Sequence, residues 1–452
     1  MKSTLNSPQN ENIMGTEKMN RLIITTGIPL MLSLLINSLY NFVDSVFVSR
    51  VSEDALTALS LAAPVQIFIS ALGFGNAVGL NAVISKALGE RNADRVKNSA
   101  NAAIFLGLCS WVLIAVLCIL FVQPYFAWQS GGNETIAKYG RDYLTICMLF
   151  SFGQMGQWVF DRFVIASGKS QLFLFTLSAA SLTNLILDPI FIFGLLGFPR
   201  METLGAAIAT VTGQIAGMIA GILINRKWNK DIPFSFSLRP DRKCIIAILK
   251  VRIPSTLVQV LTSVVSVVMN SLLLTFSTTA VAVYGICVKI QNIVTVGVHG
   301  IDNGLIPIVA YNLGAKKRLR INDAIKWAII YSILFYLVFF TCLECVPGLV
   351  LKIFKASDYM LAIGIPALRL LAVAYFVSIP NLVFAAALQG LSLGTKSMYL
   401  TMARQAVLPV VFAWGLQWFG VLDLIWCAFI FAELIGIPFG IFLWKKGFAS
   451  NL

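Results

Sequence analysis

Long apolar stretches, separated by short polar connections, follow one another along almost the whole chain. Each is longer than the roughly 20 residues that a helix needs to cross a bilayer, and none resembles the alternating ten-residue segments of a membrane barrel. Because a backbone in lipid must satisfy its own hydrogen bonds, the pattern predicts helices. We expect twelve spans, at 22–48, 56–84, 98–122, 138–166, 171–196, 204–225, 246–274, 280–310, 324–348, 360–390, 397–418 and 421–444.

The composition also indicates a membrane protein. Hydrophobic residues make up 58% of the chain and charged residues only 12%, whereas about 25% of a soluble domain is charged. A bilayer accounts for this much apolar surface, and a water-soluble core does not. The fold class that we expect is an all-α membrane protein in contact with membrane lipids.

Lys and Arg residues gather in alternate connections between the spans. The dense groups lie before the first span and at 86–97, 226–252, 316–320 and 445–446, and the connections between them are sparser. By the positive-inside rule the dense groups face the cytoplasm. This predicts a multi-pass protein of the inner (plasma) membrane with both termini cytoplasmic. The net charge of +14 fits the anionic inner leaflet. Because the basic residues form no separate domain, we expect no nucleic-acid partner.

An internal repeat divides the chain into two halves. When the chain is shifted by 225 residues, Pro29 aligns with Pro254, Gly79 with Gly304, Gly89 with Gly314 and Arg95 with Arg320. Six spans separate equivalent points, so the halves have the same orientation and are related by an axis along the membrane normal. We expect an N-terminal tail (1–21), a six-helix lobe (22–226), a linker (227–243), a second six-helix lobe (244–446) and a C-terminal tail (447–452).

Acidic and amide residues interrupt two spans of the first half. Asn37, Tyr40 and Asp44 share one face of the first span, and Asn184 and Asp188 share one face of the fifth. A carboxylate inside a membrane is costly and is therefore a candidate for function. Two carboxylates with amide oxygens suit a hard cation such as Na⁺, and they would equally take up a proton.

Six short segments, in a fixed order, resemble the MATE (multidrug and toxic compound extrusion) family over nearly the whole chain. They are Gly27-Ile28-Pro29, Val43-Asp44, Gly89-Glu90-Arg91, Ala166-Ser167-Gly168, the segment 184–189 and the segment 205–210. The pattern is most similar to the DinF-like branch of bacterial multidrug transporters. The resemblance implies a two-lobed exporter of organic, often cationic compounds that is driven by entry of Na⁺ or H⁺.

The resemblance also implies a site for the coupling ion. In the DinF-like branch the acids of spans one and five act with an asparagine and a threonine of the first lobe. The matching residues here are Asp44, Asn184, Asp188 and Thr210. Another branch uses acids in spans seven and ten, and 253–275 and 360–390 contain none. This difference favours the first lobe as the place for Na⁺ or H⁺.

Further polar residues within spans are candidates for lining a substrate cavity. The predicted set is Asn37, Tyr40, Gln154, Gln157, Asp161, His299 and Asp302. For two of them a local role is an alternative. Asp161 stands next to Arg162 and is able to form a salt bridge with it, and a lone histidine such as His299 is often a packing residue.

The expected function is secondary active antiport of small organic molecules for H⁺ or Na⁺, by alternating access between the lobes. The sequence contains no Walker A, HExxH or GxSxG motif, so we expect no enzyme activity and no cofactor besides the coupling ion. We expect the protein to act as a monomer. The alternative is a flippase of lipid-linked oligosaccharides or lipids from the same superfamily, for which we expect a strongly cationic central cavity.

Overall fold

The chain forms long helices joined by short connections. The computed structural model describes residues 12–130, 132–235, 237, 239–353 and 357–450. Among these residues, ten helices are long and apolar enough to cross a membrane. The predicted fourth and eleventh spans supply two further crossings, because each consists of shorter helical pieces in sequence. The prediction of an all-α membrane protein with about twelve crossings is confirmed.

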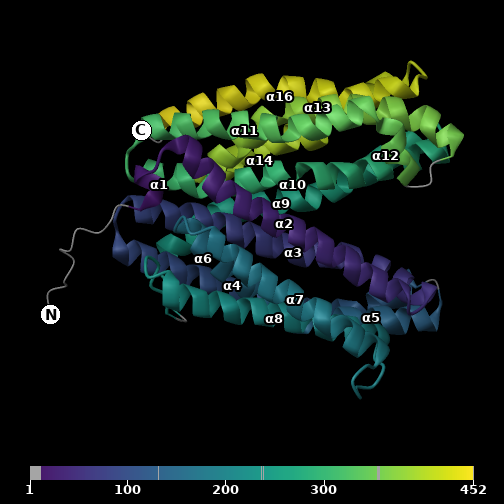
Figure 1. Cartoon of the computed structure of the whole chain (residues 1–452), viewed down its shortest axis with the longest axis horizontal. Coiled ribbons are helices and arrows are strands. Elements are labelled where there is room, and N and C mark those ends of the chain that lie inside the picture. The colour runs from purple at the N-terminus through teal and green to yellow at the C-terminus, as the bar shows by residue number, and fades with distance from the viewer. Residues whose placement is uncertain (1–11, 131, 236, 238, 354–356, 451–452) are drawn as a thin grey trace.

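Two groups of roughly parallel helices correspond to the two halves of the chain (Figure 1). The first group contains α2 (Met19–Ser49), α3 (Glu53–Gly89), α4 (Ala93–Gln129), α5 (Glu134–Leu149), α6 (Phe152–Ala166), α7 (Gln171–Phe193) and α8 (Glu202–Trp228). The second contains α9 (Arg242–Leu274), α10 (Thr278–Gly314), α11 (Arg318–Cys345), α12 (Pro347–Ile353), α13 (Asp358–Gly390), α14 (Gly394–Met402), the π-helical turn η1 (Ala403–Val407), α15 (Leu408–Gln417) and α16 (Leu422–Ser450). A short helix, α1 (Ile13–Thr16), precedes them.

The ribbons of the two groups approach each other at one end of the molecule and diverge toward the other (Figure 1). The end where they approach carries α1 and the C-terminal end of α16, and we call it the terminal end. The antiparallel course of the helices also brings the dense basic connections to this end. The other end carries the sparser connections.

The span predicted at 138–166 consists of two helices, because the helix breaks between α5 and α6. The break is stable in these apolar surroundings because the carbonyl groups that it frees accept hydrogen bonds from side chains. The Trp111 indole donates to the Leu149 carbonyl oxygen at 2.7 Å, and the Ser151 hydroxyl donates to the Met148 carbonyl oxygen at 2.8 Å. A backbone at membrane depth is stable only when such groups are paired.

The sequence repeat corresponds to a repeat in local structure. Helices α3 and α10 both have 37 residues. Each begins after a serine, Ser52 or Ser277, whose Oγ accepts a hydrogen bond of 3.0 Å from the amide three residues later. Arg91 and Lys316, which follow these helices, both have positive φ, at 54° and 58°. The equivalent turns therefore have the same geometry in both halves.

Helices α2, α3, α9 and α10 form the contact between the halves, with α3 packed along α9 and α2 packed along α10. At the terminal end α3 and α10 also meet closely. A Cβ atom on Gly89 would overlap the Tyr311 carbonyl oxygen, and one on the equivalent Gly314 would overlap the Lys86 carbonyl oxygen. Glycine permits this approach, and close packing of small residues is what associates membrane helices.

The segment around α1 contacts both halves at the terminal end. Asn12 Nδ2 donates to the Ser167 carbonyl oxygen of the first half at 2.9 Å. The Met14 carbonyl oxygen accepts from Asn312 at 3.0 Å and from Arg320 at 3.2 Å, both in the second half. The Met14 side chain is fully buried. This segment therefore ties the two halves together where they lie closest.

We expect Gly89→Ala and Gly314→Ala to destabilise the protein by about 1–3 kcal/mol each, because the added methyl group forces α3 and α10 apart. The measurement is the thermal unfolding midpoint of the purified protein in detergent. The matched control is Gly285→Ala, since Gly285 lies in α10 and a Cβ there has open space around it. Equal midpoints for all three variants would show that the glycine contact does not hold the halves together.

Candidate functional site

Two carboxyl groups meet between α2 and α7 inside the first half. Asp44 of α2 and Asp188 of α7 lie close enough to interact electrostatically. Asp188 is fully buried. Two carboxyl groups form a hydrogen bond only when one carries a proton, and two charged carboxylates repel each other strongly in apolar surroundings. This pair is therefore suited to hold a proton or another cation.

Helices α7 and α8 supply two further polar groups to the pair. Asn184, one helical turn before Asp188 on the same face, donates its amide to Asp188 Oδ1 at 3.2 Å. The same amide nitrogen lies 3.4 Å from Thr210 Oγ1 on α8. Asn184 thus positions the Asp188 carboxyl group and links it to the neighbouring helix. The structure brings all four predicted coupling residues into one cluster.

The oxygen atoms of this cluster fit a hard cation. Among the described residues, Asp44 Oδ1, Asn184 Oδ1 and Asp188 Oδ2 are buried and have no hydrogen-bond partner. Carboxylate, amide and hydroxyl oxygens are the ligands that such cations prefer. Asp44, Asn184, Asp188 and Thr210 would hold Na⁺, or the two carboxyl groups would share a proton. Either occupant supplies the positive charge that the pair requires.

A second polar cluster in the first half contains two of the predicted substrate residues. Gln157 and Asp161 of α6 are buried, and the Asp161 carboxyl group lies near Thr176 of α7 and near Gln157. The guanidinium of Arg162 donates to Asn303 Oδ1 on α10 at 2.9 Å. Arg162 thus links the two halves, rather than forming the hydrogen-bonded pair with Asp161 that its position in the sequence suggested.

The remaining predicted substrate residues come from both halves of the chain. Asn37 on α2 and Gln154 on α6 are half-buried. The side chain of Tyr40 lies outside the described residues. His299 and Asp302 lie in the second half, where both line a cavity of about 490 Å³.

The second-half cavity also contains charged residues that the sequence did not single out as part of a site. Arg404 of η1 donates to Glu433 Oε1 on α16 at 2.6 Å, and Asn381 of α13 donates to Glu433 Oε2 at 2.7 Å. Both Arg404 and Glu433 line the cavity. The signal that points to them is a charged side chain within an apolar span, the same signal that identified Asp44.

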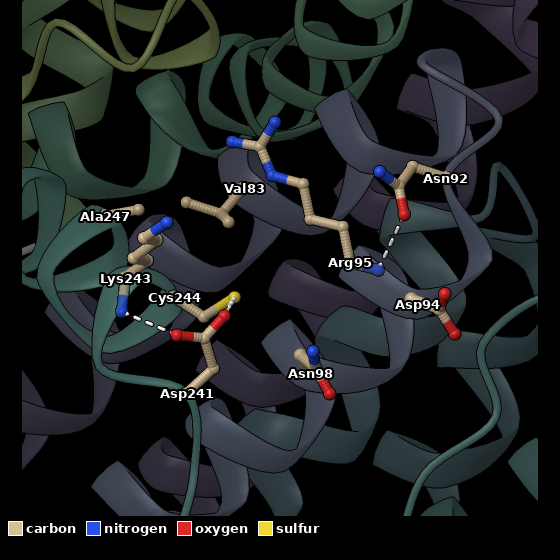
Figure 2. A pocket seen from close by; sticks show the side chains of 9 residues that line it. All are labelled: Val83, Asn92, Asp94, Arg95, Asn98, Asp241, Lys243, Cys244 and Ala247. Carbon is tan, nitrogen blue, oxygen red and sulfur yellow. Dashed lines mark hydrogen bonds between the residues drawn. The ribbon is translucent and has the colours of Figure 1, made fainter.

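Another cavity, of about 340 Å³, lies at the terminal end between α3, α4 and the start of α9 (Figure 2). Figure 2 shows that Asn92 Oδ1 accepts from the Arg95 amide and that Asp241 accepts from the Lys243 amide. These bonds cap the first turns of α4 and α9. The polar groups of this cavity thus serve the helix ends, and the carboxyl pair lies toward the opposite end of α2.

The MatE family model matches the chain twice, at residues 29–190 and 254–414. The two matches together cover well over half of the chain, and they begin 225 residues apart, which is the spacing of the internal repeat. Each half of the chain is therefore one copy of the same family unit.

Curated relatives include transporters with different cargoes. The chain is 27% identical to the multidrug export protein MepA of Staphylococcus haemolyticus, over 89% of this chain and 88% of MepA. It is 26% identical to the FAD transporter of Shewanella oneidensis, over 72% of this chain and 71% of that protein.

Solved structures share the fold. A multidrug resistance MATE family transporter of the MOP superfamily, in an outward-facing conformation, matches with a TM-score of 0.88 and 22% identity. The match covers 98% of this chain and 99% of that chain. A MOP superfamily transporter from Pyrococcus furiosus matches with a TM-score of 0.87 and 23% identity, over 98% of both chains. These matches establish the two-lobed fold.

We expect Asn184→Leu to lower the free energy of unfolding by about 1–3 kcal/mol, because it leaves the buried Asp188 carboxyl group without its amide donor. The double variant Asn184→Leu/Asp188→Leu is expected to recover most of this loss, since both polar partners are then gone. Thermal unfolding of the purified variants measures both effects. A double variant that unfolds at a lower temperature than the single one would contradict the pairing.

Proposed function

Since the chain belongs to the MatE family of membrane transporters, we propose that it is a secondary active antiporter that exports small organic compounds in exchange for H⁺ or Na⁺. The observation that supports this proposal is the buried Asp44–Asp188 pair with Asn184 and Thr210. Such a cluster changes its charge when a cation enters or leaves, and a transporter needs a coupling step of this kind.

The position of Asp44 connects the cluster to the contact between the halves. Helix α2 packs against α7 of its own half and against α10 of the other half. When the pair is empty, two carboxylates repel each other across α2 and α7, and when it is occupied this repulsion is removed. A change in the position of α2 relative to α7 is then transmitted to α10. In this way occupancy of the pair would bias the two halves between inward and outward openings.

The relatives support export of small organic compounds, since MepA of two Staphylococcus species is named a multidrug export protein. We propose cationic or amphipathic compounds as cargo. We also propose that the terminal end, with both termini, faces the cytoplasm at the plasma membrane; the dense basic connections at this end support this orientation. We propose that the protein acts as a monomer, because both halves of the transporter belong to one chain.

We expect Asp44→Asn and Asp188→Asn each to reduce gradient-driven export by at least about tenfold, because an amide does not exchange a proton or neutralise a cation. The measurement is export of a fluorescent organic cation from proteoliposomes with an imposed H⁺ or Na⁺ gradient. The control is Asp358→Asn, which alters an exposed carboxylate at the start of α13. Export at the wild-type rate in both variants would place the coupling site elsewhere. Cargo transport at a rate that depends on neither the H⁺ nor the Na⁺ gradient would favour the flippase alternative.

We expect Thr210→Val to distinguish the two coupling ions. If Na⁺ is bound, removal of the Thr210 hydroxyl deletes a ligand and raises the Na⁺ concentration needed for half-maximal export by several fold. If only a proton is bound, H⁺-driven export keeps its wild-type dependence. Thr212→Val is the matched control, because the Thr212 hydroxyl donates to the Ile208 carbonyl oxygen of its own helix at 2.7 Å. A loss that is equal in both variants would assign Thr210 a packing role.

A further inference from the structure

The short helix α1 lies on three polar side chains that the second half provides at the terminal end. We call these side chains the seat, and they are Asn312, Lys317 and Arg320, around the connection from α10 to α11. They donate four hydrogen bonds of 2.7–3.2 Å to the carbonyl oxygens of residues 14, 15 and 17. A helix leaves its last carbonyl groups without intrahelical partners, and here the seat satisfies them.

The first half holds α1 by fewer contacts. Asn12 Nδ2 donates one hydrogen bond to the Ser167 carbonyl oxygen in the connection from α6 to α7. A Cβ atom on the neighbouring Gly168 would lie 3.2 Å from the side chains of Ile13 and Met14. The Met14 side chain is fully buried. This side of α1 is therefore sealed by packing and by a single hydrogen bond from Asn12.

The second half binds this part of the chain more firmly than the first half does. The seat contributes four hydrogen bonds, against one from the first half. The start of α2 follows the same preference, because Met19, Leu22 and Ile23 belong to a core cluster that is built mainly from the second half. The contact of α1 with the first half is therefore the one that separates more easily.

The seat depends on residues that the internal repeat does not share. At the spacing of 225 residues, Arg320 corresponds to Arg95. Arg95 forms an ion pair with Glu90 of the preceding turn. The position equivalent to Glu90 in the second half is Ala315, which offers no carboxylate. Arg320 is therefore left to bind the carbonyl groups of α1.

The equivalent place in the first half is the cavity of about 340 Å³ at the terminal end (Figure 2). Its lining includes Arg95, the counterpart of Arg320. It also includes Asp241 of the linker, which is the counterpart of Thr16 in α1. Figure 2 shows no hydrogen bond between Arg95 and Asp241. One seam between the halves is thus filled by a packed helix, whereas the equivalent seam contains a cavity.

We propose that α1 is a clasp that keeps the terminal end closed, and that this end opens when α1 leaves the first half while it stays on its seat. The inference rests on the proposed alternation between inward and outward openings. The halves cannot separate at this end while Asn12 and the seat both keep their bonds. Glu17 and Lys18, with ψ angles of 150° and 132°, form an extended connection between α1 and α2. This connection is the hinge that the movement requires.

The first test removes the contact with the first half and leaves α1 intact. Asn12 Oδ1 accepts from the Met14 amide and so caps α1, while Asn12 Nδ2 bonds to Ser167. Asn12→Asp keeps the capping oxygen and loses the donor. The readout is the rate at which Ala82→Cys reacts with a maleimide in the purified full chain. Ala82 of α3 is fully buried in the core cluster that is built mainly from the second half.

Asn12→Asp is expected to raise this rate by about three- to tenfold, since the loss of one hydrogen bond shifts the equilibrium toward the open end by such a factor. Mass spectrometry of the peptide that contains residue 82 separates this reaction from those of the native cysteines. Asn92→Asp is the matched control, because Asn92 caps α4 at the same end and its hydrogen bond stays within the first half. An unchanged rate in Asn12→Asp, or an equal rise in Asn92→Asp, would overturn the clasp.

The second test determines which half releases α1. A short bis-maleimide joins Asn12→Cys to Ser167→Cys in one double variant, and Glu17→Cys to Arg320→Cys in another. Gradient-driven export from proteoliposomes is compared before and after crosslinking of each variant. The crosslink between residues 12 and 167 is expected to reduce export by at least about tenfold, because it fixes the closed end. The crosslink between residues 17 and 320 is expected to leave most of the export. An equal loss in both variants, or a loss in neither, would contradict the proposed release.

The clasp and the antiport function fail separately. The reaction of Ala82→Cys requires no transport, so it tests the clasp whatever the protein exports. If Asn12→Asp leaves the rate at residue 82 unchanged while the wild type exports, the clasp fails and the antiport function stands. If Asn12→Asp raises the rate while the wild type shows no gradient-driven export, the antiport function fails and the clasp stands.

Discussion

The structure depends on one constraint: a charged group inside an apolar helical bundle must be neutralised by a group in direct contact with it. Asp44 and Asp188 face each other with Asn184 as a donor, and three of the oxygens in this cluster are without a partner among the described residues. Water does not screen these groups, so a bound proton or cation has a large effect on their mutual repulsion. The same constraint gives Arg404 its Glu433 partner.

The close contact between the two halves connects the carboxyl cluster to the rest of the molecule. Helices α2, α3, α9 and α10 pack across the repeat axis, and glycine at 89 and 314 allows α3 and α10 to approach closely at the terminal end. The segment around α1 and the Arg162–Asn303 hydrogen bond connect the halves further. Because α2 belongs both to this contact and to the carboxyl cluster, we propose that the charge state of the cluster acts on the arrangement of the halves.

Much of the fold was predictable because the bilayer imposes simple rules on the sequence. Span length, the basic connections and the Pro29/Pro254 and Gly89/Gly314 coincidences defined the helices and the repeat. Asp44, Asn184, Asp188 and Thr210 were predicted to form one coupling site. The structure places the four residues together, and their role in coupling stays a prediction. The break between α5 and α6 was not predictable, since it depends on Trp111, which is distant in sequence. The role of Arg404 was missed for the same reason: its partners Glu433 and Asn381 come from other helices, and only the folded chain brings them into one wall.

The most direct test of the account is whether the Asp44–Asp188 carboxyl groups change their state when the coupling ion binds. Infrared difference spectroscopy of the purified protein, recorded while H⁺ in the buffer is exchanged for Na⁺, follows the carbonyl stretch of a protonated carboxyl group. The account predicts a carboxyl band that disappears during the exchange and that is absent from the spectra of Asp44→Asn and Asp188→Asn. A band that persists unchanged in these two variants would contradict it.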